Sequence, residues 1–402
     1  MDWQSLDERY IMSTYRRLPI AIAKGEGNYL YDTDGNKYLD LFTGLAVNVL
    51  GHSHPRIVQA LVEQGKQFLH ISNVFLNPPA IRLAQRLVEA SIPGKVFFSN
   101  SGAEATEAAI KLIHKWTKNE GLGREGIVVF RNSFHGRTLG AVRLTRQPGV
   151  YQDYPQPAFP VYELDVGDAD GLREICRKAK PAALLMEPVL GSGGIIPLSE
   201  SFLREAEQIC REEGMLLAID EIQTGMGRTG KLFAYQHAGI TPDLILFAKG
   251  VGGGLPLGGV IAGHRLINQF QPGDHGTTFA PSPLSAALGN AVLDELLNPA
   301  FAAHVEEVIR SLWKGLENLR QRYPGQLKEL RGKGMMVGIP LHVSPAEASQ
   351  LQRNLLKEGV LVDITQKTIV RLLPPLTLTK ADIDFFLEVF ARQVAELAAR
   401  EA

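Results

Sequence analysis

The chain has 402 residues, of which 45% are hydrophobic and 21% charged, a composition typical of a globular protein with a sizeable core. Its formal net charge is −1 and its basic residues form no long run, which disfavours a polyanion-binding or membrane-binding surface. We therefore expect neither nucleic acid nor a membrane as a partner.

The first predicted element is a β-hairpin, because residues 28–41, NYLYDTDGNKYLDL, place Asp-Gly between two aromatic-rich runs. From about residue 95 to 263, short apolar runs alternate with helical patterns, and the runs predict strands: KVFFS, GIVVF, AALLMEP, MLLAID, LILFAK and GGVIAG. Since these runs are continuously apolar, they indicate strands buried on both faces of a mainly parallel α/β sheet.

The helix predicted from Glu104 to about Lys118 is amphipathic, so we expect its apolar face to pack on this sheet. After about residue 284, long helices at 301–323 and 379–398 are interleaved with the strand-like runs GMMVGIPL, VLVDI and IVRLL. We therefore predict an N-terminal segment (1–50) that packs with a small domain, a large domain (51–284) and a small C-terminal α+β domain (285–402).

The N-terminus and the cysteines indicate the compartment. MDWQSLDERY carries acids where a secretory signal would carry basic and then apolar residues, and no stretch has 18 consecutive apolar residues. Cys176 and Cys210 lack metal-ligand or redox spacing, so we expect free thiols in a reducing compartment. These features predict a cytoplasmic protein without a metal site.

The stretch LLAIDEIQTGMGRTGKL, residues 216–232, contains a G-x-G-x-x-G pattern. In a dinucleotide site the first glycine directly follows a strand, whereas four residues here separate Asp220 from Gly225. A second match at residues 121–126 precedes a predicted strand instead of following one. We therefore disfavour a dinucleotide site, and Asp220 requires another explanation.

Two of the predicted strands end in motifs that could bind a cofactor, since ligands of open α/β sheets bind at the carboxyl ends of strands. In SNSGAEATEAAIKL, the N–H groups of Gly102 and Ala103 at a helix start could hold a phosphate, although Ser101 and Glu104 also fit an ordinary helix cap. In FRNSFHGRTLG, Phe134 precedes an imidazole and a guanidinium; taken alone, it is more typical of a core residue.

Asp220 and Lys249 end two further apolar runs. A lone lysine entering the loop VGGGLPLGG would be read as a surface residue. If both residues end successive strands of one sheet, however, a carboxylate and an amine face the same crevice. An aldehyde cofactor with a phosphate and a pyridine nitrogen needs such an amine and carboxylate, together with a helix N-terminus and a stacking ring.

Eight motifs, in one order from about residue 18 to the C-terminus, resemble the class III (subgroup II) pyridoxal-phosphate-dependent aminotransferases of fold type I. They are KGEGNYLYDTDGNKYLD, LGHSHP, SNSGAEA, FHGR, DEIQTGMGRTG, FAKGVGGGLPLGG, HGTTFAPSPL and VRLLPPLTLT. Within the family the chain is most similar to the acetylornithine-specific enzymes. The resemblance implies a large, mainly parallel-sheet α/β domain that binds the cofactor, and a smaller α+β domain built from both termini. It also implies a homodimer with active sites at the subunit interface.

The resemblance also implies roles for individual residues around pyridoxal phosphate. Lys249 would form the covalent link and then act as the base, and Asp220 would pair with the pyridine nitrogen. Gln223 would lie near the phenolic oxygen and Phe134 would stack on the ring, with Glu221 as a further cofactor contact.

The resemblance assigns the phosphate to the N–H groups of Gly102 and Ala103, with Thr278 contributed by the partner subunit. Arg137 and Thr277 would contact the amino donor.

One departure from the family pattern concerns the acceptor. These enzymes usually read E-P-[IV]-Q-[GS]-E-G-G, whereas residues 187–194 here read EPVLGSGG, with Leu190 and Ser192 as the changed positions. The missing glutamate pairs with the arginine at the position of Arg371, which takes the α-carboxylate of glutamate or 2-oxoglutarate. We therefore expect Arg371 to lack a carboxylate partner and to be open in both half-reactions.

The leading functional hypothesis is transfer of an ω-amino group from N-acetylornithine, or a close ornithine-like donor, to 2-oxoglutarate, giving glutamate and a semialdehyde. The alternative within the class is an ω-amino acid or diamine transaminase using pyruvate, because such enzymes resemble this chain at residues 191–194. Other hypotheses are a racemase or mutase on the same fold, a nucleotide-dependent dehydrogenase, and a cofactor-free binding protein.

Overall fold

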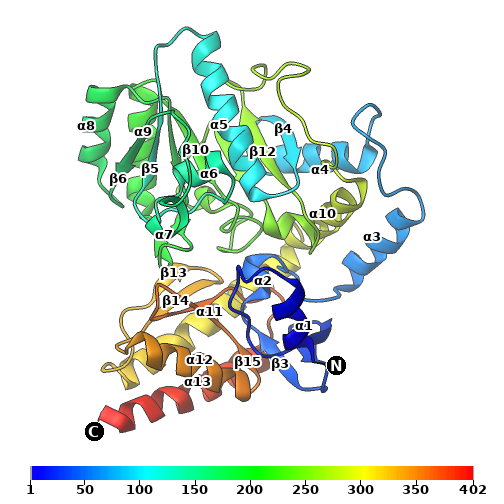
Figure 1. Cartoon of the computed structure of the whole chain (residues 1–402), viewed down its shortest axis with the longest axis vertical. Coiled ribbons are helices and arrows are strands. Elements are labelled where there is room, and N and C mark those ends of the chain that lie inside the picture. The colour runs from blue at the N-terminus through cyan, green and yellow to red at the C-terminus, as the bar shows by residue number, and fades with distance from the viewer. Residues whose placement is uncertain (1, 402) are drawn as a thin grey trace.

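The computed structural model describes residues 2–401. A large α/β part lies above a smaller part in which the N-terminal elements, blue, lie beside the orange and red C-terminal ones (Figure 1). The strands of the large sheet have the order β4-β12-β11-β10-β7-β5-β6. Strand β12 runs opposite to the other strands, and the remaining neighbours pair in parallel, so the sheet is mainly parallel, as predicted. The strands are β4 (Gly94–Ser99), β5 (Ile127–Phe130), β6 (Val161–Leu164), β7 (Ala183–Met186), β10 (Leu216–Asp220), β11 (Leu244–Phe247) and β12 (Gly258–Gly263).

Both faces of this sheet are buried, because successive strand residues enter two different hydrophobic clusters. Val129 and Ala218 pack with α5 (Gly102–Asn119), whereas Val128 and Ile219 pack on the opposite side with residues of α8 (Ala169–Ala179) and α9 (Glu200–Glu212). The apolar face predicted for the helix at 104–118 is the face of α5 that is buried. Continuous apolar runs therefore correspond to two-sided burial here.

The N-terminal hairpin is present and is completed by the C-terminal part of the chain. Strands β1 (Ile22–Glu26), β2 (Tyr29–Asp32) and β3 (Lys37–Asp40) form an antiparallel ribbon, and β15 (Val360–Leu361) pairs parallel with β3. A second sheet is wholly antiparallel, with the order β13-β14-β17-β16: β13 (Arg331–Lys333), β14 (Met336–Pro340), β16 (Asp363–Thr365) and β17 (Ile369–Leu372).

The run VLVDI was expected as one strand, and the structure corrects this. Val360 and Leu361 pair with β3, whereas Asp363 to Thr365 pair with β17, so the run divides between two sheets at Val362. An apolar run shows only that a segment is extended and buried, and the choice of pairing partner depends on the rest of the fold.

Helices complete both parts. In the large part, α10 packs against α3, α4 and η2, and in the smaller part α13 packs against α11 and α12. The helices not yet given are α1 (Trp3–Tyr10), α2 (Thr43–Ala46), α3 (Pro55–Gly65), α4 (Pro78–Glu89), α6 (Leu139–Leu144), α7 (Pro148–Tyr151), α10 (Pro283–Leu296), α11 (Pro299–Arg322), α12 (Pro345–Lys357) and α13 (Lys380–Glu401), with the 3-10 turns η1 (Ala234–His237) and η2 (Lys249–Gly252). The short strands β8 (Val189–Leu190) and β9 (Ile196–Pro197) pair with each other.

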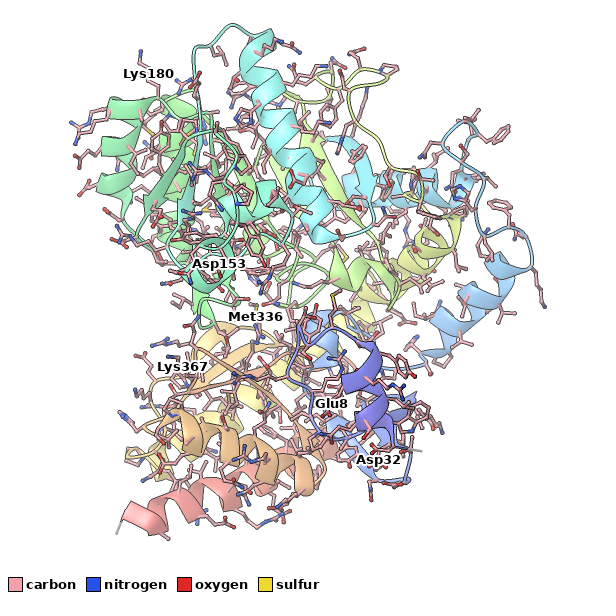
Figure 2. The ribbon with its side chains drawn as sticks, in the orientation of Figure 1. Glu8, Asp32, Asp153, Lys180, Met336 and Lys367 are labelled. Carbon is pink, nitrogen blue, oxygen red and sulfur yellow. The ribbon has the colours of Figure 1, made fainter. Side chains whose placement is uncertain are left out.

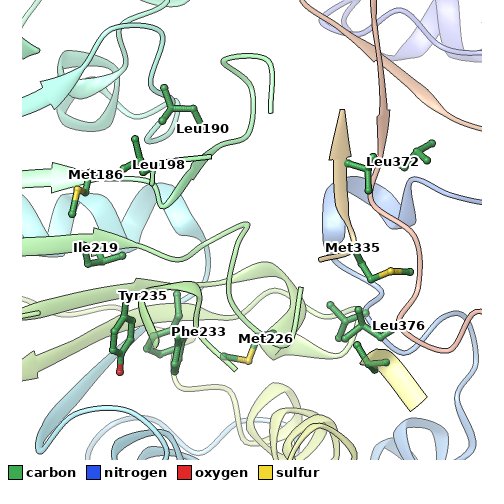
Figure 3. Packing of buried hydrophobic residues seen from close by; sticks show 14 of the residues in the cluster. Met186, Leu190, Leu198, Ile219, Met226, Phe233, Tyr235, Met335, Leu372 and Leu376 are labelled. Atoms are coloured by element: carbon green, nitrogen blue, oxygen red, sulfur yellow. The ribbon is translucent and has the colours of Figure 1, made fainter. Parts of the chain in front are cut away.

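One hydrophobic cluster joins the two parts. Met186 and Ile219 from the large sheet belong to the same cluster as Leu372 and Leu376 from the C-terminal part (Figure 3). Met336 lies where the two parts meet (Figure 2). This shared core fixes the C-terminal residues relative to the carboxyl ends of the large-sheet strands.

Two further findings concern the cysteines and the apolar segments from which the sequence analysis inferred the cellular compartment. Cys176 and Cys210 are both buried free thiols. Within residues 2–401, no helix is long and apolar enough to cross a membrane.

Candidate active site

A cavity of about 700 Å³ lies where the large sheet meets the C-terminal part. Most of the residues singled out from the sequence line it: Gly102, Ala103, Phe134, Arg137, Asp220, Gln223, Lys249 and Arg371. No group of three or more His, Cys, Asp or Glu side chains in the described part of the chain could hold a metal ion. The cavity therefore brings together an amine, carboxylates and a guanidinium from distant positions in the sequence.

Asp220 and Lys249 reach the cavity from neighbouring strands. Strand β10 ends at Asp220, which lies opposite Leu246 of the parallel strand β11, and Lys249 lies two residues after the end of that strand. The structure thus places the carboxylate and the amine at the same edge of the sheet, which was the condition for reading them as a pair.

The Asp220 carboxylate is buried and held from two sides. His135 Nδ1 lies 2.7 Å from Oδ2, and since a carboxylate only accepts, the imidazole donates. The backbone N–H of Ile222 donates to Oδ1 at 3.0 Å. His135 is itself buried, and its Nε2 has no partner among residues 2–401. His135 therefore fixes the orientation of the acid, a role that the sequence motif FHGR did not reveal.

Lys249 occupies a strained and buried position. Its φ of 51° lies in the left-handed region, which is uncommon for a residue with a side chain. Burial lowers the pKa of the Lys249 ammonium; the negative charges of Asp220 and Glu187 oppose this shift, whereas the charge of Arg371 adds to it. A lowered pKa increases the fraction of neutral amine, which is the nucleophilic form.

Glu187 is a cavity residue that the sequence analysis did not select. Its Oε1 accepts from the backbone N–H of Phe134 at 2.9 Å, and its Oε2 accepts from the N–H of Gly191 at 3.1 Å. Burial raises the pKa of this carboxyl to about 7. Glu187 therefore ties together the two loops on which Phe134 and Gly191 lie. Its place directly after an apolar strand, at the start of EPVLGSGG, was the available signal.

The N-terminus of α5 combines a helix cap with exposed donors. Ser101 Oγ accepts from Glu104 N at 3.2 Å, so the ordinary capping interpretation is correct. Helix geometry leaves the N–H groups of Gly102 and Ala103 without intrahelical acceptors, and both residues line the cavity. A Cβ at Gly102 would lie 2.9 Å from the side chain of Ile222, so this position has no room for a larger residue.

Phe134 and Gln223 provide an aromatic face and an amide. Phe134 is half-buried at the cavity wall instead of in the core, and the guanidinium of the exposed Arg137 lies 5.5 Å from its ring centroid. Gln223 Oε1 is buried and has no hydrogen-bond partner within residues 2–401. A Cβ at Gly191 would lie 1.9 Å from that oxygen, so Gln223 fits only beside glycine.

Three of the expected residues lie outside this cavity. The carboxylate of Glu221 is buried, with Thr224 Oγ1 and the N–H of Tyr235 as its donors, because consecutive residues of an extended chain point in opposite directions. The Glu221 side chain therefore points away from the cavity, and a cofactor contact at this residue stays a prediction. Thr277 accepts from Asn100 Nδ2 at 3.0 Å through its Oγ1, and Thr278 is exposed.

Arg371 differs from expectation, because it does have a carboxylate partner. Asp363 Oδ2 lies 2.6 Å from Nη2 and 2.8 Å from Nε of the buried arginine. The expectation that Arg371 lacks a carboxylate partner is therefore wrong, and the reason is a neighbouring strand whose pairing the sequence did not reveal. Nη1 of Arg371 is buried without a hydrogen-bond partner in the described chain.

The residues of the cavity fit pyridoxal phosphate. Free backbone N–H groups at a helix N-terminus suit the phosphate, a half-buried aromatic side chain suits the ring, and Gln223 Oε1 is a buried polar atom that still needs a partner. The carboxylate at Asp220 and the amine at Lys249 complete the set that such a cofactor requires.

Comparisons with known proteins agree with this geometry. The family model described as Aminotransferase class-III matches residues 10–394. The acetylornithine aminotransferase of Caldanaerobacter subterraneus subsp. tengcongensis is 39% identical over 392 residues, which cover 97% of this chain and 98% of that protein. The acetylornithine aminotransferase of Aquifex aeolicus is 40% identical over 382 residues, covering 94% and 98%.

Solved structures are similar over the whole chain. A Toxoplasma gondii ornithine aminotransferase with pyridoxal phosphate at partial occupancy in its active site matches with a TM-score of 0.94 and 27% identity, covering 99% of this chain and 95% of that one. The acetylornithine aminotransferase of Elizabethkingia anophelis matches with a TM-score of 0.88 and 31% identity, covering 98% of both chains. The chain therefore belongs to the class III aminotransferases and is a pyridoxal-phosphate-dependent transaminase.

Proposed function

We propose that the chain transfers the δ-amino group of N-acetylornithine, or of a close ornithine-like donor, to 2-oxoglutarate, giving glutamate and a semialdehyde. The observation that carries this proposal is the presence of Arg371 in the same cavity as Lys249, with a buried Nη1 that has no partner within residues 2–401. A guanidinium facing a cavity suits a dicarboxylate acceptor. The acetylornithine aminotransferases among the relatives support the donor.

Bound pyridoxal phosphate supplies an aldehyde that takes up the amino group and a ring that withdraws electrons from the reacting carbon. We assign its phosphate to the N–H groups of Gly102 and Ala103, its ring face to Phe134 and its phenolic oxygen to Gln223. Support comes from the common cavity that these residues line.

Two ionisable residues carry the proposed proton chemistry. Asp220 would hold a proton on the ring nitrogen, and His135 keeps the acid in place by donating to it. Lys249 Nζ would carry the covalent link to the cofactor. It would then move a proton between the reacting carbon of the amino donor and the aldehyde carbon of the cofactor. The lowered pKa of Lys249 favours this role, because an amine must be neutral to accept a proton.

We also propose a homodimer in which Thr278 of one subunit completes the phosphate site of the other, with Thr277 and Arg137 contacting the donor. Asn73 Nδ2 donates to Thr277 O and Ala280 O, so the segments 73–76 and 277–280 lie together. Their apolar side chains are strongly exposed: Val74, Phe75, Leu76 and Phe279. An apolar surface of this kind is typical of a protein interface. Sedimentation equilibrium should give a dimer, and a monomer at micromolar concentration would contradict the proposal.

A second candidate is an ω-amino acid or diamine transaminase with pyruvate as the acceptor. The observation in its favour is Ser192, an uncharged residue in the cavity where the related enzymes carry glutamate. Pyruvate has one carboxylate and needs no second cation.

A panel of donors and acceptors separates the two candidates. N-acetylornithine, ornithine, 4-aminobutyrate and β-alanine are each assayed with 2-oxoglutarate and with pyruvate. We expect the highest kcat/KM for N-acetylornithine with 2-oxoglutarate. Higher kcat/KM with pyruvate for β-alanine or a diamine would replace the leading proposal by the second one.

A further inference from the structure

The hairpin formed by β16 and β17 brings Arg371 to the substrate cavity and places a second charged residue beside it. Its antiparallel register places Asp363 directly opposite Arg371. Its turn contains Gln366 and Lys367, the latter labelled in Figure 2, and Gln366 Nε2 donates to the carbonyl of Ser192 at 2.7 Å. The hairpin therefore carries the arginine and also holds the loop in which the family's glutamate is missing.

The ion pair uses only one edge of the guanidinium. A single oxygen, Asp363 Oδ2, accepts from both Nε and Nη2, at 2.8 and 2.6 Å. The Arg371 side chain is 8% exposed and that of Asp363 is 25% exposed, so the arginine is the more deeply buried partner. Both protons of Nη1 and the second proton of Nη2 remain for a ligand at the far end of the group.

We infer that Asp363 is a permanent counterion of Arg371, which sets how tightly the enzyme binds a substrate carboxylate. The inference rests on the proposed function, in which Arg371 takes the carboxylate of the acceptor. An incoming carboxylate would meet a neutral pair instead of a free cation and would bind end-on, through Nη1 and Nη2. Asp363 thus takes over the charge compensation that a glutamate at position 192 would provide.

The position of Asp363 makes its effect different from that of a residue on a separate loop. Asp363 and Arg371 are cross-strand neighbours within one hairpin, so the backbone register keeps their side chains adjacent whatever the position of the loop at Ser192. The pair therefore persists in both half-reactions, and it lowers the affinity for carboxylates of donor and acceptor alike. A residue at 192 could instead leave the arginine by a loop movement alone.

The substitution Asp363→Asn separates charge from orientation. Asparagine keeps an oxygen that can accept from Nε and Nη2, so the direction of the guanidinium is retained while the negative charge is lost. We expect the holoenzyme variant to bind glutarate, a dicarboxylate without an amino or oxo group, about 5- to 30-fold more tightly, as expected when one charge of a partly exposed pair is removed.

The test is isothermal titration calorimetry of holoenzyme variants with glutarate. Asp363→Glu should keep the affinity near that of the parent, and Asp384→Asn serves as a matched control because Asp384 pairs with Lys380 on an exposed helix face. If Asp363→Asn does not fold, Asp363→Ser also removes the charge, and the same tightening is expected. Thermal unfolding of each variant shows whether it is folded.

Arg371→Ala distinguishes failure of this inference from failure of the proposed function. If Arg371→Ala abolishes glutarate binding and Asp363→Asn leaves the affinity unchanged or weaker, the counterion role is refuted and the acceptor site stands. If Arg371→Ala leaves glutarate binding unchanged, Arg371 is not the carboxylate site, and both proposals fall.

Discussion

The substitution Gly191→Ala tests whether the position of Gln223 matters for cofactor binding. The added Cβ would lie 1.9 Å from Gln223 Oε1 and 3.2 Å from Cε of Met336. The amide oxygen would have to move by roughly 1.5 Å to reach an ordinary contact distance. Gln223 is the closer neighbour, so we expect its side chain to move away from the place in which it would contact the phenolic oxygen of the cofactor.

The size of the effect follows from the cost of overpacking, which is typically about 1–3 kcal/mol. If this cost falls on the cofactor-bound state, the dissociation constant for pyridoxal phosphate rises roughly 5- to 150-fold. The backbone N–H groups of Gly191 and Phe134 both donate to Glu187. Overpacking at Gly191 would therefore also strain the connection to Phe134.

The assay is an equilibrium titration of the cofactor-free protein with pyridoxal phosphate, followed by absorbance. Gly149→Ala in α7 is the matched control, because a Cβ there would meet nothing within 4 Å. Thermal unfolding of the cofactor-free variants separates lost affinity from lost stability. An unchanged dissociation constant together with an unchanged unfolding temperature would refute the argument, since it would mean that the loop accommodates the methyl group without moving Gln223.

The other predictions concern the ionisable residues. Lys249→Ala should abolish transamination and also the covalent attachment of the cofactor that borohydride reduction makes permanent. Mass spectrometry that found the reduced cofactor on another lysine would contradict the assignment. Asp220→Asn should slow turnover roughly a hundredfold to a few thousandfold, because losing a buried charge partner costs about 3–5 kcal/mol; near-normal kcat would mean that this acid is structural. Burial raises the pKa of Glu221 from 4.5 to about 7, so its contribution to stability is greatest below pH 4.5 and is lost as the pH rises through 7, by up to about 3 kcal/mol. We therefore compare the free energy of unfolding in urea of Glu221→Gln with that of the parent. The variant should gain stability over the parent when the pH is raised from 5 to 8, and an equal difference at both pH values would refute this.

The strands of the large sheet could be predicted because two-sided burial leaves a continuous apolar run in the sequence. The ends of these runs identified Asp220 and Lys249, since parallel strands bring their carboxyl ends to one edge. Asp363 could not be found in this way, because its contact with Arg371 depends on a register between two short strands. The direction of the Glu221 side chain likewise depends on where β10 ends, and a shift of one residue would reverse it.

Thr278 shows a different limit. The role expected for it depends on a second subunit, and within one chain Thr278 is simply exposed. Glu187 shows a third limit. In the structure its buried carboxylate accepts from two backbone N–H groups, whereas in the sequence it resembles any other acid that follows a strand. Sequence patterns indicate what a segment buries, whereas pairwise contacts between distant segments require the fold.

The pairing of β3 with β15 has a consequence for the order in which the protein can be made. Val360 is the parallel partner of Leu39, so the N-terminal ribbon lacks its last strand until the ribosome has synthesised almost the whole chain. The large sheet needs nothing beyond Gly263 and can form much earlier. We therefore expect the α/β core to assemble while the edge of β3 is still unpaired. Chaperones could recognise this exposed edge during translation.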